Sequence, residues 1–366
     1  MSLSPSELAL PLPQRRWWRR RGLPVLLFLA YLSGLVYLGF MLFIYIRYNV
    51  LITSRSHTIN YLQIIYPEFY TTGVLKIPPD DGDQHLNVVL IGGSTLEQTA
   101  DELSIALKTA WKSDVRIYNL AKAAHTSRDT LFKFRELPVN NIDLIVLYDG
   151  FNDIRMNNVT RSDFMIDYTH CEWYLDLEQK LKLKQADLED IMRHNLNAVG
   201  RRIRLDRPET HLIDEGAVIK TEDSFRQNIS EILQSCQTRR IPVVLMTFAS
   251  YLPENYSQER FVNGDLDYGS GDYRMAAESW GRPEAVRNTL AVHNRVLREL
   301  ARSPEFAGTV RFIDQEELLA ANGMHFSDPC HLTSEGIRQF VRNIVASLDK
   351  PTDIDVDATS SLRESD

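Results

Sequence analysis

The chain has 366 residues, of which 44% are hydrophobic and 25% are charged, and its formal net charge is −8. This length allows one large domain with a real core, or two small domains. Residues 1–50 hold six Arg and one Glu, so the rest of the chain carries 35 basic and 48 acidic side chains, a net charge of −13. So acidic a domain argues against nucleic acid or an anionic lipid surface as its partner.

The first feature in chain order is an apolar segment, 23–46, which contains 24 residues and no charged side chain. As a helix it would span about 36 Å, enough to cross a bilayer. A cleaved signal peptide would have a shorter apolar core followed by small residues, and Ile44–Asn49 offers no such cleavage site. The sequence therefore favours a retained single-pass membrane anchor. Its expected interfacial residues are Trp17, Trp18, Tyr45 and Tyr48.

The arginines around this segment predict its orientation. Five precede it within 1–22, whereas only Arg47 follows closely. By the positive-inside rule, the basic tail 1–22 stays in the cytoplasm and the C-terminal domain lies on the extracytoplasmic side, whether periplasmic, extracellular or lumenal.

The remaining chain is expected to comprise a connector, 47–85, a domain, 86–349, and an acidic polar tail, 350–366, that we expect to be disordered. The connector contains three prolines and is expected to pack loosely against the domain. Within the domain, short apolar runs alternate with segments of helical periodicity. The expected strands are Asn87–Ile91, Val115–Asn119, Leu144–Tyr148, Pro242–Phe248 and Val310–Ile313, and the expected helices are Leu96–Lys112, Thr130–Arg135, Ser224–Thr238, Pro283–Ser303 and Ser334–Leu348. This order predicts a three-layer α/β/α domain around a mostly parallel sheet.

Two long insertions, at about 154–220 and 250–282, interrupt this alternation. The first contains an expected helix, Leu175–Arg193, and the second is rich in Gly, Asp and aromatic residues. Both follow strands, so we expect them at the end of the sheet where loops shape a binding site, unless they are surface elaboration alone. Three cysteines, Cys171, Cys236 and Cys330, form no disulfide framework, although one pair is compatible with an extracytoplasmic domain.

Ser94 lies where the strand Asn87–Ile91 ends at Gly92-Gly93 and a helix begins. This junction suits a nucleophile, because ligands collect beyond the carboxyl ends of parallel strands and a helix start offers free backbone N–H groups. A simple helix cap by Ser94 is the structural alternative.

A second group of polar residues stands near the C-terminus, in Asp328-Pro-Cys-His331. An Asp three residues before a His in one turn can orient the imidazole as a general base. A capped loop is the alternative, with Thr333 or Ser334 starting the next helix. A metal site at His325–His331 is disfavoured, because the Cys and His around Pro329 do not match a zinc spacing.

Two further blocks follow strands. Asn152, in Gly150-Phe-Asn-Asp153, could direct its amide NH₂ at a developing oxyanion, or else form an Asx-turn. The stretch 119–127 follows the strand Val115–Asn119 and includes Ala124.

Taken together, the blocks Gly92-Gly-Ser-Thr-Leu96, Asn119 to Ala124, Gly150-Phe-Asn-Asp153 and Asp328-Pro-Cys-His331 resemble those of the SGNH (GDSL-type) hydrolase family in order and context. The resemblance covers about 87–348 without the insertions. It implies Ser94 as nucleophile, His331 as general base and Asp328 as its orienting acid. It also implies an oxyanion hole of the Ser94 N–H, the Ala124 N–H and the Asn152 side chain, and no metal or organic cofactor.

Two positions depart from the family pattern. Gly93 stands where the family name implies Asp, which should leave the nucleophile intact. Ala124 stands where the family usually has Gly, so its N–H serves as a donor only if the local backbone tolerates a Cβ. The Gly-x-Ser-x-Gly elbow of α/β-hydrolases is absent, because Leu96 occupies its last position.

The resemblance implies an enzyme that transfers acyl groups from esters. The expected membrane anchor and the long loops suit envelope glycans or lipids as its substrates. Water as the acceptor would make it an esterase or deacetylase, and a sugar hydroxyl would make it an O-acyltransferase. A catalytically silent SGNH-like assembly or binding module of the cell envelope is the third alternative.

Overall fold

The computed structural model describes residues 16–51, 61–77, 85–137, 141–183 and 212–348. These residues belong to two compact units. The first contains helix α1, Arg16–Leu51. Its stretch Pro24–Phe43 has the length and apolar composition of a membrane-spanning helix or of a signal sequence. The expected tail 350–366 and the side chains of Trp17, Trp18 and Tyr48 lie outside the described residues.

The second unit is built on a parallel sheet of five strands, all of which the sequence predicted. They are β1 Leu86–Gly92, β2 Val115–Asn119, β3 Leu144–Tyr148, β4 Val243–Met246 and β5 Val310–Ile313. Their order in the sheet is β2-β1-β3-β4-β5. In the register, Val88 faces Ile117 of β2 and Leu144 of β3. Since β1 and β3 are buried along almost their whole length, they form the centre of the core.

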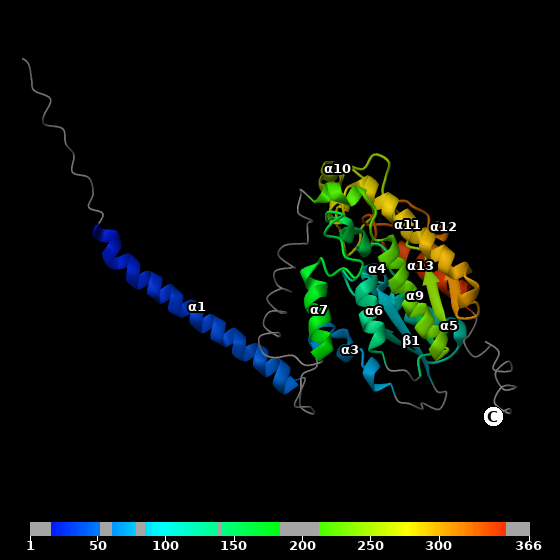
Figure 1. Cartoon of the computed structure of the whole chain (residues 1–366), viewed down its shortest axis with the longest axis horizontal. Helices are drawn as coiled ribbons and strands as arrows, with labels where there is room; N and C mark the ends of the chain where they lie inside the picture. Colours follow the sequence, from blue (N-terminus) through cyan, green and yellow to red (C-terminus); the bar gives the residue numbers. More distant parts are fainter. Residues whose placement is uncertain (1–15, 52–60, 78–84, 138–140, 184–211, 349–366) are drawn as a thin grey trace, which may run out of the picture. The chain divides into compact units, whose positions relative to one another are not determined.

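Helices cover both faces of the sheet, which confirms the three-layer prediction. They are α5 Ala100–Trp111, α6 Ser127–Arg135, α9 Glu222–Arg239, α11 Pro283–Arg302 and α13 Ser334–Ala346. Helix α5 packs against α13, whereas α9 packs against both α6 and α11 (Figure 1). This division follows from right-handed crossovers, because the chain moves from β1 to β2 in one direction and from β3 to β5 in the other.

Several predicted boundaries are corrected by the structure. The helix expected at Leu96–Lys112 is two helices, α4 Ser94–Glu97 and α5, separated where the Thr99 hydroxyl donates to the Leu96 carbonyl. Helix α6 starts three residues earlier than expected, because Thr126 and Asp129 form a capping box. The chain beyond α7, Glu172–Leu183, lies outside the described residues, so the predicted helix to Arg193 is tested only in part.

The second half of the expected connector packs tightly rather than loosely, so that expectation is wrong for residues 61–77. This stretch forms α2 Tyr61–Ile65, α3 Glu68–Thr71 and the short 3₁₀ turn Val74–Lys76. The Tyr66 side chain is fully buried and its hydroxyl donates to Asp129 at 2.9 Å. The buried Glu68 carboxylate pairs with Lys133 Nζ at 2.5 Å. The proline content of the connector gave no indication of these polar contacts with Asp129 and Lys133 of α6.

The strand order also locates a ligand site. In a doubly wound sheet of this order, ligands bind beyond the carboxyl ends of the strands where the winding direction reverses, which here is between β1 and β3. Ser94 follows β1 and Asn152 follows β3. The topology therefore brings these two predicted site residues to the same edge of the sheet.

Candidate active site

Ser94 is the first residue of α4 and follows a turn, Gly92-Gly93, whose first position requires glycine. Gly92 has φ +155°, and a Cβ there would overlap the backbone carbonyl of Tyr148 on β3. Gly93 is the N-cap, in extended conformation. The chain thus leaves β1 close against β3 and turns at once into α4, which puts the nearly buried Ser94 side chain beyond the sheet edge.

His331 lies in a tight loop, 326–333, which we call the His331 loop. Phe326 and Leu332 pair as an antiparallel bridge across it, and Ser327 N–H donates to the His331 carbonyl at 2.9 Å. Thr333 ends the loop as N-cap of α13, its hydroxyl accepting from Gly336 N–H at 3.1 Å. The backbone of His331 is therefore fixed from both sides.

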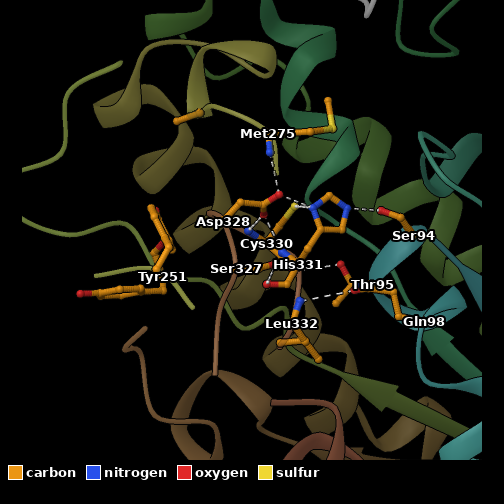
Figure 2. A network of polar contacts seen from close by, with 12 residues as sticks. Ser94, Thr95, Gln98, Tyr251, Met275, Ser327, Asp328, Cys330, His331 and Leu332 are labelled. Atoms are coloured by element: carbon orange, nitrogen blue, oxygen red, sulfur yellow. Dashed lines mark hydrogen bonds and ion pairs between the residues drawn. The ribbon is translucent and has the colours of Figure 1, made fainter. Parts of the chain in front are cut away.

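The structure brings Ser94, His331 and Asp328 into one hydrogen-bonded chain (Figure 2). Ser94 Oγ lies 2.8 Å from His331 Nε2, and His331 Nδ1 lies 2.6 Å from Asp328 Oδ2. Two more bonds join the same segments: Thr95 Oγ1 donates to the Cys330 carbonyl at 3.0 Å, and Leu332 N–H donates to Gln98 Oε1 at 3.4 Å. The relation between serine and imidazole is thus set by a network and not by one contact.

Asp328 is arranged to remain an anion. Its Oδ1 accepts from the N–H groups of Cys330 and His331, at 2.9 and 2.8 Å, and its Oδ2 also accepts from Met275 N–H at 2.9 Å. Burial alone would raise the pKa of Asp328, but the hydrogen bond and charge of His331 outweigh it and lower the pKa below its ordinary value. An ionised carboxylate on Nδ1 stabilises the imidazolium that forms when Nε2 takes a proton.

The second insertion supplies contacts that the sequence did not indicate. Besides the Met275 N–H, it places the Tyr273 ring flat on the His331 imidazole, with ring centroids 4.4 Å apart and an angle of 15°. Its glycines permit this approach, since a Cβ at Gly271 would lie 2.6 Å from Ser327. The insertion is therefore a wall of the site, and the Gly content of 250–282 was the signal for close backbone packing.

The Asn152 amide is oriented by three partners. Its Oδ1 accepts from Trp280 Nε1 at 3.0 Å and from Arg155 at 3.1 Å, and its Nδ2 donates to the His125 carbonyl at 2.9 Å. These bonds fix which end of the amide is NH₂. A Cβ on Gly93 would lie 3.0 Å from Nδ2, so the amide sits directly beside the residue before Ser94. Gly93, which stands where the resemblance implies Asp, therefore leaves room for the Asn152 amide.

Ala124 has a φ of +68°, in the left-handed region that glycine prefers. Ala124, which stands where the resemblance implies Gly, therefore has the backbone conformation that a glycine would adopt. Its Cβ is accommodated at an energetic cost. Ala124 is exposed and follows Lys122, whose N–H donates to the Gly92 carbonyl at 3.0 Å. The loop thus runs alongside the turn that carries Ser94.

Asp328, Cys330 and His331 are close enough to suggest a metal site, with one ligand atom of each lying within 4.8 Å of the others. Their environment favours hydrogen bonding instead, because the Asp328 oxygens accept four N–H groups and His331 Nε2 faces Ser94. Burial raises the pKa of the Cys330 thiol well above its usual value.

No family model and no curated protein matches the chain. Solved structures that are similar include a GDSL-like lipase from Bacteroides thetaiotaomicron, at 13% identity and TM-score 0.42, covering 78% of this chain and 97% of that one. A lipase from a goat rumen metagenome has 13% identity and TM-score 0.41, with 72% and 97% coverage. An acetyl xylan esterase from Geobacillus stearothermophilus has 13% identity and TM-score 0.38, with 72% and 94% coverage. At these values the likeness carries no activity over to this chain.

Proposed function

We propose that the chain is a serine-dependent ester hydrolase of the SGNH type, in which Ser94, His331 and Asp328 act as nucleophile, general base and orienting acid. The observation that supports this most is the buried hydrogen-bonded chain from Ser94 Oγ through His331 to Asp328. A helix cap would explain Ser94 alone, and a hydrogen-bonded loop histidine would explain His331 with Asp328. Neither alternative requires the three side chains to form one hydrogen-bonded chain.

The reaction begins when Ser94 Oγ attacks the ester carbonyl carbon while its proton passes to His331 Nε2. The negative charge that develops on the carbonyl oxygen is held by the N–H groups of Ser94 and Ala124 and by Asn152 Nδ2. When the tetrahedral intermediate collapses, the imidazolium protonates the leaving alkoxide and an acyl-Ser94 remains. Water, deprotonated by the same His331, then attacks the acyl carbon. The bond between the acyl carbon and Ser94 Oγ breaks, the imidazolium returns its proton to Ser94 Oγ, and the carboxylic acid is released.

We further propose that α1 is retained as a single-pass anchor, with the basic N-terminus in the cytoplasm and the domain on the other side. The apolar stretch Pro24–Phe43 and the arginines before it support this proposal. A domain anchored there would meet O-acyl groups of envelope glycans or lipids. A reporter enzyme fused to the C-terminus tests the orientation: activity only outside the cytoplasm is expected, and a cytoplasmic signal would contradict it.

Hydrolysis of p-nitrophenyl acetate by the full chain in detergent tests the chemistry. We expect release of p-nitrophenol by the wild type and loss of that activity in Ser94→Ala, with an unchanged melting curve. Adding a glycan acceptor distinguishes hydrolysis from transfer, because an O-acyltransferase would place the acetyl group on the glycan. A folded wild type that cleaves no ester would favour a silent binding module.

A further inference from the structure

We infer that Glu97 is a positioning residue that holds the strained Ala124 backbone in the conformation required of an oxyanion donor. This inference rests on the proposed function, since it concerns how one of the three donors is kept in place. Glu97 belongs to none of the blocks that carry the family resemblance, and it is the last residue of α4, one turn after Ser94.

Glu97 joins the nucleophile helix to the loop before Ala124 through three separate atoms. Its Oε2 accepts from Ala123 N–H at 2.9 Å, its Oε1 pairs with Lys122 Nζ, and its backbone carbonyl accepts from Asn119 Nδ2 at 3.3 Å. The first of these contacts is to the residue that directly precedes Ala124. A shift of Ala124 out of its present backbone conformation would therefore also move a group that Glu97 holds.

The loop is held after Ala124 as well, because His125 offers its carbonyl to Asn152 Nδ2 at 2.9 Å. Before Ala124, Lys122 N–H also donates to the Gly92 carbonyl at 3.0 Å. Ala124 is thus confined between a contact to a second oxyanion donor and the Glu97 contacts. A residue with a Cβ stays at a φ of +68° only when its surroundings enforce that conformation.

The bond to Ala123 N–H matters more than the ion pair. Half of the Lys122 side chain is exposed, so its attraction to Glu97 is screened by solvent. The Glu97 side chain is only 21% exposed, and its bond to a backbone N–H adjoins the strained residue directly. Gln at this position could keep the acceptor for Ala123 N–H while losing the charge.

Kinetics of p-nitrophenyl acetate hydrolysis by the full chain test the inference. In Glu97→Ala, we expect kcat to fall about tenfold with KM nearly unchanged, because an L-residue disfavours the left-handed region by roughly that factor. Ala124→Gly should restore most of the lost kcat in the Glu97→Ala background, because glycine adopts positive φ freely. Glu97→Gln should lose less than Glu97→Ala.

The control is Asp101→Ala, which removes an exposed carboxylate from the first turn of α5 and should leave kcat unchanged. An unchanged kcat in Glu97→Ala, or a loss that Ala124→Gly fails to restore, would overturn the inference while the proposed function stands. If circular dichroism shows that Glu97→Ala is unfolded, Glu97→Gln takes its place. An unchanged kcat in Glu97→Gln, or a loss that Ala124→Gly fails to restore, would then overturn the inference. A folded wild type without esterase activity would instead refute the proposed function.

Discussion

The side chains of Ser94 and His331 are 237 positions apart in the chain, yet Ser94 Oγ lies 2.8 Å from His331 Nε2. The topology brings them together. Ser94 directly follows β1, an interior strand of the sheet, and the His331 loop lies between β5 and α13. Bonds from Thr95 and Gln98 to the His331 loop then fix the approach.

We expect Asp328→Asn to lower kcat roughly 10⁴-fold, because an amide opposite Nδ1 favours the wrong imidazole tautomer and cannot stabilise the imidazolium. The measurement is the kcat of p-nitrophenyl acetate hydrolysis, with melting curves as a check on folding. Asp101→Asn, at an exposed position, is the matched control. A loss below about tenfold would show that His331 does not depend on this carboxylate.

Replacing Asn152 by Ala should lower kcat by roughly 10²–10³ if its Nδ2 stabilises the oxyanion. Trp280→Phe should cause a smaller loss, since it removes one of the two donors that orient Asn152 Oδ1 and leaves Arg155 in place. Asn263→Ala, an exposed asparagine on the short helix Gln258–Asn263, is the control. Equal kcat for Asn152→Ala and the wild type would remove this residue from the oxyanion hole.

The buried carboxyl of Asp149 should make the free energy of unfolding depend on pH. Burial and the nearby Asp153 charge raise the pKa of Asp149 well above its ordinary value of 3.8. A carboxyl whose pKa is raised by folding stabilises the fold fully below the unfolded pKa and loses this contribution as the pH rises towards the folded pKa. Asp149→Asn should therefore match the wild type near pH 4 and be increasingly more stable above it. Urea unfolding at several pH values checks this, and parallel curves would contradict it.

Glu68→Ala should lower the free energy of unfolding by about 3–5 kcal/mol, because it leaves the buried Lys133 ammonium without its partner. Burial already lowers the pKa of Lys133, against the effect of Glu68. Glu259→Ala, at an exposed site, should change stability by no more than about 0.5 kcal/mol. Urea titrations of the full chain compare the two variants. A similar small change in both would mean that residues 61–77 do not stabilise the domain.

The sequence predicted the five strands because each is a short run rich in β-branched and other apolar residues, and segments of helical periodicity separate the runs. It also predicted that Ser94 and Asn152 follow strands that meet at one edge. It did not predict Met275, Tyr273 or Trp280 as partners of the site, because their roles depend on the path of the second insertion. Nor did it predict the packing of Tyr66 and Glu68, since pairing of a buried polar side chain with a distant residue leaves no periodic pattern.

Labelling with a fluorophosphonate probe, read by intact mass and peptide mapping, tests the central claim most directly. The probe forms a covalent bond with a serine only when a base activates its hydroxyl. We predict one adduct per chain, located on Ser94 and lost in Ser94→Ala and in His331→Ala. A folded wild-type protein that takes up no probe, or that carries it on another serine, would contradict the account.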